Sequence, residues 1–243
     1  KYHNDRYYNQ DDPEISDYEY DKLSQRLRTL ERDYPELDSP DSPTKNIGGK
    51  AKREAGVLVR HNVPMLSLQD VFNKEEVLSF VEKILSYRRD TVFCVERKID
   101  GLSVALRYTD GELTTGITRG DGVSYGEDVT DNIKVIKDVK HNLKDNVPYI
   151  EIRGEIYMKT EDFEEVNNKL ELAGKKLFAN PRNCAAGTLR QLDSSIVKER
   201  KLSLFAFNVQ DTEGIRFASH SESLEWIKKQ GIKVIEGYRL CRT

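Results

Sequence analysis

Hydrophobic and polar positions alternate along the chain with two periods, and each period predicts a different element. Between Ser16 and Tyr34 an apolar side chain recurs every three or four residues, which is the stripe of an amphipathic helix. Ser16 is followed three residues later by Glu19, so we expect a capping box at its start. Pro35 ends this helix. A shorter helix is expected upstream, before the polar turn that ends at Pro13.

Further along the chain the period shortens to two and predicts strands. Residues 102–108 and 112–118 alternate on either side of Asp110-Gly111, a dipeptide typical of a tight hairpin turn. We expect further strands at 91–97, 147–158, 202–209 and 232–235, and helices that begin near Asn73, Thr160 and Ser219. The strands come in hairpins with helices between the groups. This order favours an α+β fold with largely antiparallel sheets over a doubly wound parallel sheet.

A change in composition suggests where the chain divides. Residues 38–52 contain Pro40, Pro43, Gly48 and Gly49 and few apolar side chains, so we interpret them as a linker. The prediction is a small helical subdomain with its linker at 1–54 and a larger domain at 55–243. A chain of 243 residues is long enough for this arrangement.

Overall composition limits the class of protein. The net charge is −3, whereas a domain that grips DNA alone is usually strongly basic, so we expect any nucleic-acid affinity to be weak or shared with other parts. The three cysteines are far apart and form no Cys-x-x-Cys pair, which favours a reducing cytoplasm. No apolar run approaches the ~18 residues of a membrane span. Because the chain starts without Met and stops abruptly, we expect it to be part of something longer.

Lys98 is the strongest candidate for chemistry. It ends an apolar, β-prone run, lies between Glu96 and Asp100, and is followed by Gly101. A lysine is a nucleophile only when neutral, so its pKa has to be lowered by burial or by nearby cations. The sequence offers Arg97, Arg119 and Arg153 for this, or a bound metal ion. Alone, the motif also fits a solvated surface lysine, because Lys-x-Asp-Gly occurs by chance in about one chain in twenty of this length.

Three other features suit a phosphate-bearing ligand. Arg119 begins a glycine-rich loop, 119–127, which offers a cation and exposed backbone amides. A loop with no binding function has the same sequence features. Glu155 interrupts an apolar strand. If its side chain faces a cleft, it can bind a ribose hydroxyl or magnesium; if it faces solvent, it is an ordinary surface residue. Arg182 and Arg190 flank a run of small residues, either to bind phosphates or as surface arginines on a tightly packed helix.

Taken together, these motifs resemble bacterial NAD-dependent DNA ligases in order and spacing over essentially the whole chain. The residues that carry the resemblance are Pro13-Glu-Ile-x-Asp17-x-Glu-Tyr-Asp21, Val63-Pro-Met-Leu-Ser-Leu68, Glu96-x-Lys98-x-Asp100-Gly101, Thr118-Arg-Gly-Asp-Gly122, Ile152-Arg-Gly-Glu155 and Phe178-Ala-Asn-Pro-Arg182. The resemblance implies a nucleotidyltransferase fold, the adenylation domain, preceded by a small helical subdomain. It also implies that the chain ends before two later lysine-bearing motifs and lacks the DNA-wrapping domains.

The resemblance assigns roles residue by residue. Lys98 falls on the lysine that takes AMP, Glu96 lies beside the adenine, and Arg119 lies near the ribose and phosphate. Glu155 becomes a ribose or metal contact. The other implied NAD contacts are Ser67, Leu68, Asp100, Arg182 and Arg190, and, for the nicotinamide mononucleotide half, Tyr7, Tyr8, Asp17, Tyr18, Glu19, Tyr20 and Asp21. Tyr8 stands where many relatives have histidine, and Cys184 replaces a common alanine and is expected to have no chemistry.

The nicotinamide contacts also have a physical rationale. Asp17 and Asp21 are one helical turn apart and Tyr20 is on the adjoining face. Nicotinamide in NAD is a pyridinium cation, which an aromatic face and two carboxylates suit. Without the family, the simpler interpretation is that Tyr20 belongs to the core and the aspartates form a solvated face.

The implied reaction is attack of Lys98 on the α-phosphate of NAD, with Mg²⁺ and arginines stabilising charge. In the full-length family the AMP then serves to seal nicked duplex DNA in replication and repair. For this chain we expect a monomer that binds NAD, has impaired self-adenylation, binds DNA weakly or not at all, and has no membrane contact or resident metal. Zn²⁺ belongs only to the absent zinc-finger region. Two alternatives stay open: an ATP-dependent lysine nucleotidyltransferase, and a non-catalytic nucleotide-binding module.

Overall fold

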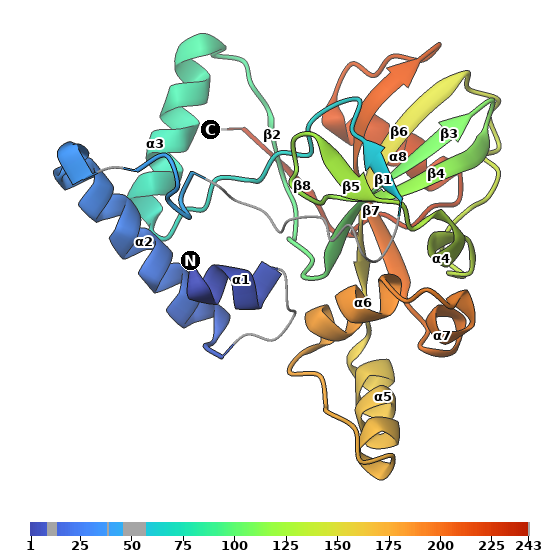
Figure 1. The fold of residues 1–243 in the computed structure, drawn as a ribbon. Coiled ribbons are helices and arrows are strands. Elements are labelled where there is room, and N and C mark those ends of the chain that lie inside the picture. Colours follow the sequence, from blue (N-terminus) through green and yellow to red (C-terminus); the bar gives the residue numbers. More distant parts are fainter. Residues whose placement is uncertain (9–13, 38, 46–56, 243) are drawn as a thin grey trace.

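The computed structural model describes residues 1–8, 14–37, 39–45 and 57–242. Most of the expected linker at 38–52, together with the expected domain boundary after residue 54, lies outside the described residues. Two groups of elements stand apart in Figure 1, with the first helices on one side and a sheet on the other.

The first group, here the helical segment, contains α1 (Tyr2–Tyr8), α2 (Asp17–Asp33) and the short 3₁₀ helix η1 (Pro35–Leu37). The predicted capping box of α2 is confirmed. The Glu19 backbone N–H donates to Ser16 Oγ at 3.3 Å, and the Ser16 N–H donates to Glu19 Oε2 at 2.9 Å. The Tyr20 hydroxyl donates to Asn4 Oδ1 at 2.7 Å and so links α2 to α1.

The second group, here the sheet body, is built on a four-stranded sheet in the order β4-β3-β6-β7. Its strands are β3 (Leu102–Thr109), β4 (Glu112–Thr118), β6 (Tyr149–Tyr157) and β7 (Ser203–Glu213), and each neighbouring pair is antiparallel. The predicted hairpin is confirmed: Asp110 and Gly111 have φ of 49° and 76°, the left-handed values that a tight turn between twisted strands requires. The α+β fold class is therefore confirmed.

Helices cover this sheet and close its core. They are α4 (Thr130–Lys134), α5 (Thr160–Leu172), α6 (Pro181–Leu189), α7 (Ser194–Glu199) and α8 (His220–Lys229). Val104, Leu106, Ile152, Ile156 and Leu204 are 0% exposed, and each such side chain contributes roughly 1.5–3 kcal/mol by leaving water. The small-residue run forms the tightly packed helix α6, where Cys184, Ala185 and Ala186 are buried.

One expected strand is wrong. Residues 232–235 form only an isolated parallel bridge, in which the Ala206 N–H donates to the Lys233 carbonyl at 2.8 Å. Ile232 and Val234 are nevertheless buried, so their apolar character reflects core packing rather than sheet pairing. The last strand is β8 (Arg239–Cys241), which lies later in the chain. All three of its residues are exposed, so no alternation of buried and exposed positions marks it as a strand.

Two short ribbons and one further helix complete the described elements. β1 (Leu58–Arg60) pairs with β5 (Tyr125–Glu127), and β2 (Phe93–Val95) pairs with β8. β2 is shorter than the strand expected at 91–97. The helix α3 (Lys74–Tyr87) begins after Asn73 as predicted, but none of its residues is buried. Among the described residues, no helix has both the length and the apolar character needed to cross a membrane.

Candidate functional site

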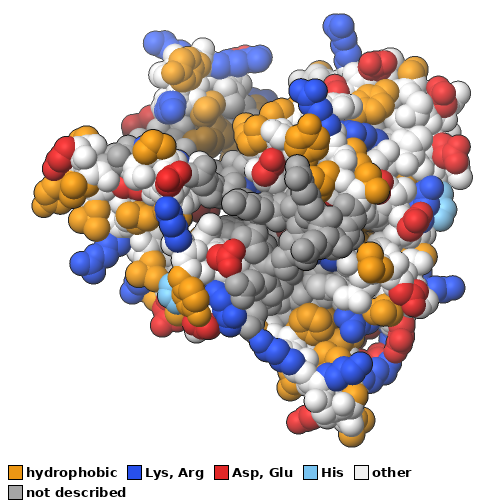
Figure 2. Space-filling view, viewed as in Figure 1, with side chains coloured by type: hydrophobic (Ala, Val, Ile, Leu, Met, Phe, Trp, Pro, Cys, Tyr) orange, Lys and Arg blue, Asp and Glu red, His pale blue; other side chains and the backbone are white. Residues whose placement is uncertain are grey.

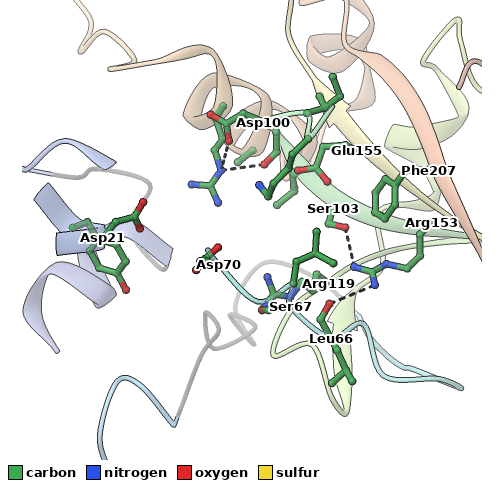
Figure 3. Close-up of a pocket in the computed structure, with 18 of the residues that line it drawn as sticks. Asp21, Leu66, Ser67, Asp70, Asp100, Ser103, Arg119, Arg153, Glu155 and Phe207 are labelled. Atoms are coloured by element: carbon green, nitrogen blue, oxygen red, sulfur yellow. Dashed lines mark hydrogen bonds and ion pairs between the residues drawn. The ribbon is translucent and has the colours of Figure 1, made fainter. Parts of the chain in front are cut away.

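A cleft of about 820 Å³ lies between the helical segment and the sheet body. Its volume falls within the usual range for small-molecule sites. Figure 3 shows Asp21 on one side of this cleft, Asp100, Glu155 and Arg119 on the other, and Asp70 between them. The predicted site residues that line it are Tyr20, Asp21, Ser67, Leu68, Glu96, Lys98, Asp100, Arg119, Glu155, Arg182 and Arg190.

Five predicted residues of the helical segment are not placed in the cleft. Glu19 is occupied by the α2 cap, and Tyr18 is 67% exposed with Lys22 Nζ 4.4 Å from its ring centroid. Neither lines the cleft. The side chains of Tyr7, Tyr8 and Asp17 lie outside the described residues.

Lys98 lies on the segment that joins β2 to β3 and lines the cleft with an exposed side chain. Gly101 explains the tight exit from this segment, because a Cβ there would sit 2.2 Å from the Ile156 carbonyl oxygen on β6. Arg182 fixes the same turn: its Nε donates to the Gly101 carbonyl at 3.1 Å and lies 3.3 Å from Asp100 Oδ1. Packing against α6 and β6 therefore sets where Lys98 enters the cleft.

Glu155 faces the cleft rather than bulk solvent. Burial raises its pKa from 4.5 to about 7, although the positive charges of Lys98 and Arg182 act in the opposite direction. Burial therefore favours the protonated form of this carboxyl group more than water does. The predicted carboxylate inside an apolar strand does face a cleft, and it lies within electrostatic range of Lys98.

Two arginines bring positive charge to the same cleft. Arg119 Nη2 donates to Ser67 Oγ at 2.7 Å, and Arg153 Nη2 contacts Ser103 Oγ at 3.4 Å. The Arg153 guanidinium also lies 5.3 Å from the Phe207 ring centroid. Within the described part of the chain, the Nε–H groups of both arginines are buried without a hydrogen-bond partner. Buried donors of this kind are costly unless an acceptor arrives, and a phosphate oxygen is a suitable one.

The glycine-rich loop differs from the expectation. The backbone N–H groups of Arg119, Asp121 and Gly122 already donate to carbonyls of Ser103, Tyr125 and Arg119. Asp121 Oδ1 accepts from the N–H groups of Val123, Ser124 and Tyr125 at 2.8, 2.7 and 3.1 Å. Burial alone would raise the pKa of Asp121, but these hydrogen bonds outweigh it and lower the pKa. The expected cradle of exposed amides is therefore wrong at these positions, and the Arg119 side chain is what the loop presents to the cleft.

Arg153, Phe207 and His220 also line the cleft, although they were not among the predicted NAD contacts. Arg153 is two residues from Glu155 on β6, so strand alternation places both on one face and was a usable signal. No local sequence pattern marks Phe207 as a residue of the cleft. His220, the first residue of α8, contacts Glu96 through Nε2 and Oε1 at 2.6 Å, across 124 positions of sequence. No local pattern reports a contact at that separation.

These features point to a class of protein. An antiparallel sheet carries a Lys-x-Asp-Gly turn beside a cleft lined by arginines and a partly buried carboxyl group, an arrangement that suits a nucleotide-binding domain. The chain belongs to the NAD-dependent DNA ligase family: residues 56–243 match the NAD-dependent DNA ligase adenylation domain. Residues 1–48 match the DNA ligase-like, N-terminal NAD⁺-binding domain.

Curated relatives agree with this family. The chain is similar to the DNA ligase of Clostridium kluyveri (56% identical over 243 residues) and to that of Acetivibrio thermocellus (50% identical over 242 residues). It is also similar to the DNA ligase of Thermotoga petrophila, at 46% identity over 245 residues. The matches cover 99–100% of this chain but only 35–36% of those ligases, so the chain spans about a third of their length.

Proposed function

We propose that Lys98 is the nucleophile that takes AMP from NAD. Its neutral Nζ attacks the α-phosphate, the bond to nicotinamide mononucleotide breaks, and a phosphoramidate to AMP forms. The observation that carries the proposal is the position of Lys98 in a cleft that the guanidinium-bearing residues Arg119 and Arg153 also line. Guanidinium donors stabilise the charge on phosphate oxygens without reorganising.

The helical segment supplies the other half of the proposed substrate site. Tyr20 and Asp21 line the cleft opposite Lys98 and suit the pyridinium ring of NAD through an aromatic face and a carboxylate. Lys98 is exposed, and closure of the helical segment over the sheet body would give its amine a less hydrated environment. We infer that substrate binding and closure occur together.

Magnesium fits this cleft as an accompanying ion. Mg²⁺ prefers oxygen ligands, usually one or two carboxylates together with substrate phosphates. Glu155 and Asp100 supply such oxygens, and the raised pKa of Glu155 shows a buried carboxyl that a nearby cation would help to ionise. When bound, the ion would supply positive charge to the phosphate oxygens. The steps assigned to Lys98 and the arginines do not depend on where it sits.

The relatives are named DNA ligases, and we propose that the complete protein uses the adenylate to seal nicked duplex DNA. This face of the chain offers no basis for strong DNA binding on its own, because Lys and Arg side chains are interspersed with Asp and Glu over its described part (Figure 2). With a net charge of −3, we expect the DNA contacts to come from parts of the protein beyond this chain.

Intact-protein mass spectrometry after incubation with NAD and Mg²⁺ tests the proposal. We expect the parent chain to gain the mass of AMP at a reduced rate, in keeping with its expected impaired self-adenylation, and Lys98→Ala to gain none. Lys98→Arg should also fail, because arginine does not lose its proton. Lys83→Ala, an exposed lysine of α3, is the matched control and should be adenylated like the parent.

Two further arms separate the alternatives. Replacing NAD with ATP should give no adduct; an adduct from ATP alone would favour an ATP-dependent nucleotidyltransferase. Reversible NAD binding with no adduct on any lysine would instead favour a non-catalytic nucleotide-binding module. An adduct on Lys98→Ala would remove Lys98 from the reaction.

A further inference from the structure

We propose that Cys94, Glu96 and His220 form a binding site for a thiophilic divalent transition-metal ion of the Zn²⁺ class. One ligand atom from each residue lies within 4.8 Å of the other two, and all three residues are partly buried. Bonds of about 2.0–2.3 Å from zinc to N, O and S place tetrahedral ligand atoms roughly 3.3–3.7 Å apart. The 4.8 Å limit exceeds this spacing by roughly 1 Å, so binding an ion requires a small movement of the side chains and replaces the 2.6 Å hydrogen bond between His220 and Glu96.

The fold holds the three ligands from separate elements. Cys94 lies on β2, whose pairing with β8 opposes it to Leu240. Glu96 is two residues further along the same extended segment, so its side chain shares the Cys94 face. His220 begins α8, which is capped by Ser219 and anchored where Ser223 Oγ donates to the His220 carbonyl at 2.7 Å. Two supports that do not depend on an ion, a ribbon and a helix start, therefore bring the ligands together.

The mixture of ligand atoms selects the ion. One sulfur, one imidazole nitrogen and one carboxylate oxygen suit Zn²⁺, Co²⁺ and similar ions, whereas Mg²⁺ favours oxygen-only sites. Three protein ligands leave a fourth position for water or a ligand atom. On binding, the Cys94 thiol loses its proton to solvent and coordinates as a thiolate. The site is thus distinct in chemistry from the magnesium proposed for the reaction.

An ion bound by these three residues would also affect the cleft. Glu96 and His220 both line it, whereas Cys94 does not. An ion held by all three would turn two cleft side chains away from a nucleotide. We infer that metal binding and NAD binding exclude each other. This second step rests on the proposed function, since it needs NAD in that cleft, while the metal site itself does not.

Co²⁺ absorbance tests the site without any nucleotide. We expect one equivalent of Co²⁺ to give thiolate-to-cobalt charge-transfer bands with the intensity of a tetrahedral site. Zn²⁺ should abolish the bands and excess Mg²⁺ should leave them unchanged. Cys94→Ser should lack the charge-transfer bands. Cys241→Ser, which alters the exposed thiol on the partner strand β8, should retain them. Absence of the bands in the parent, or their persistence in Cys94→Ser, overturns the proposal.

NAD titrations test the exclusion. At free Zn²⁺ about ten times its own Kd, competition raises the apparent Kd for NAD about tenfold. Cys94→Ser should bind NAD like the parent without metal and show no response to Zn²⁺. Cobalt bands together with a Zn²⁺-independent NAD Kd would overturn the exclusion. Cobalt bands in a protein that binds no NAD would instead overturn the proposed function and leave the metal site standing.

Discussion

The sheet body and the helical segment face each other across one cleft, yet they are stabilised to very different extents. In the sheet body Ile152, Ile156 and Leu204 are 0% exposed. In α2, Leu23 is 52% and Leu30 is 44% exposed, and no described residue of α2 is buried. Hydrophobic burial is the main favourable term in folding, so the sheet body should be much the more stable of the two. The lysine side of the cleft is therefore preformed, while the side that carries Tyr20 and Asp21 depends on local interactions.

Truncating one apolar side chain in each region is the strongest test of that difference. Ile152→Ala should lower the free energy of unfolding by about 2–5 kcal/mol, because it empties core volume. Leu23→Ala should change it by less than about 0.5 kcal/mol, because its side chain is already half in water. Urea denaturation followed by circular dichroism measures both. Equal losses from the two variants would show that the contrast is false.

Glu155→Gln tests how the carboxyl group of Glu155 affects the stability of the sheet body. The folded chain holds the Glu155 proton more tightly than the unfolded chain, since its pKa is about 7 rather than 4.5. Stability contributed by this group is therefore lost as pH rises from 4.5 to about 7. Glutamine does not titrate, so the variant should exceed the parent by up to about 3 kcal/mol above pH 7 and lose that advantage near pH 4 to 5. Denaturation at several pH values checks this, with the exposed Glu164→Gln as a control; a pH-independent difference would contradict it.

Gly101→Ala tests the packing that positions Lys98. The new Cβ would meet the Ile156 carbonyl oxygen at 2.2 Å, so the turn or β6 must shift. We expect a loss of about 1–3 kcal/mol in the free energy of unfolding, together with slower adenylation. A melting temperature and an adenylation rate both equal to those of the parent would mean that the turn is not constrained in this way.

Ser16→Ala tests the helical segment and has the smallest expected effect. Loss of the capping hydrogen bonds should cost α2 about 1 kcal/mol. Hydrogen exchange should become several-fold faster in α2 and stay unchanged in β3 and β6. Ser86→Ala, within α3, should leave α2 exchange unaltered. Faster exchange throughout the sheet would show that the two regions unfold as one unit.

The sequence predicted the elements whose signals are local. The Ser16 cap and the Asp110-Gly111 hairpin follow from hydrogen bonding and backbone geometry within four residues, and both are confirmed. The strand predicted at 232–235 is wrong because an apolar run that fills a core has the same sequence pattern as a buried strand. In α3 the apolar side chains of Val77 and Phe80 remain 45% and 48% exposed, so apolar spacing along a helix does not by itself show that the helix is buried.

The same division applies to the site. Lys98, Asp100 and Gly101 are adjacent in sequence, so the motif itself placed them together. The Arg182 contact to this turn spans 81 positions, and that of His220 to Glu96 spans 124. Such contacts arise from tertiary packing, which no short pattern encodes. The roles inferred for Tyr20, Asp21 and the other NAD contacts stay predictions.

The central claim is that one amine, Lys98, carries the adenylate. Proteolysis of NAD-treated protein followed by tandem mass spectrometry locates the modification directly. The account predicts a single AMP on the peptide that contains Lys98, absent when NAD is omitted. AMP on a different residue, with the Lys98 peptide unmodified, would contradict it.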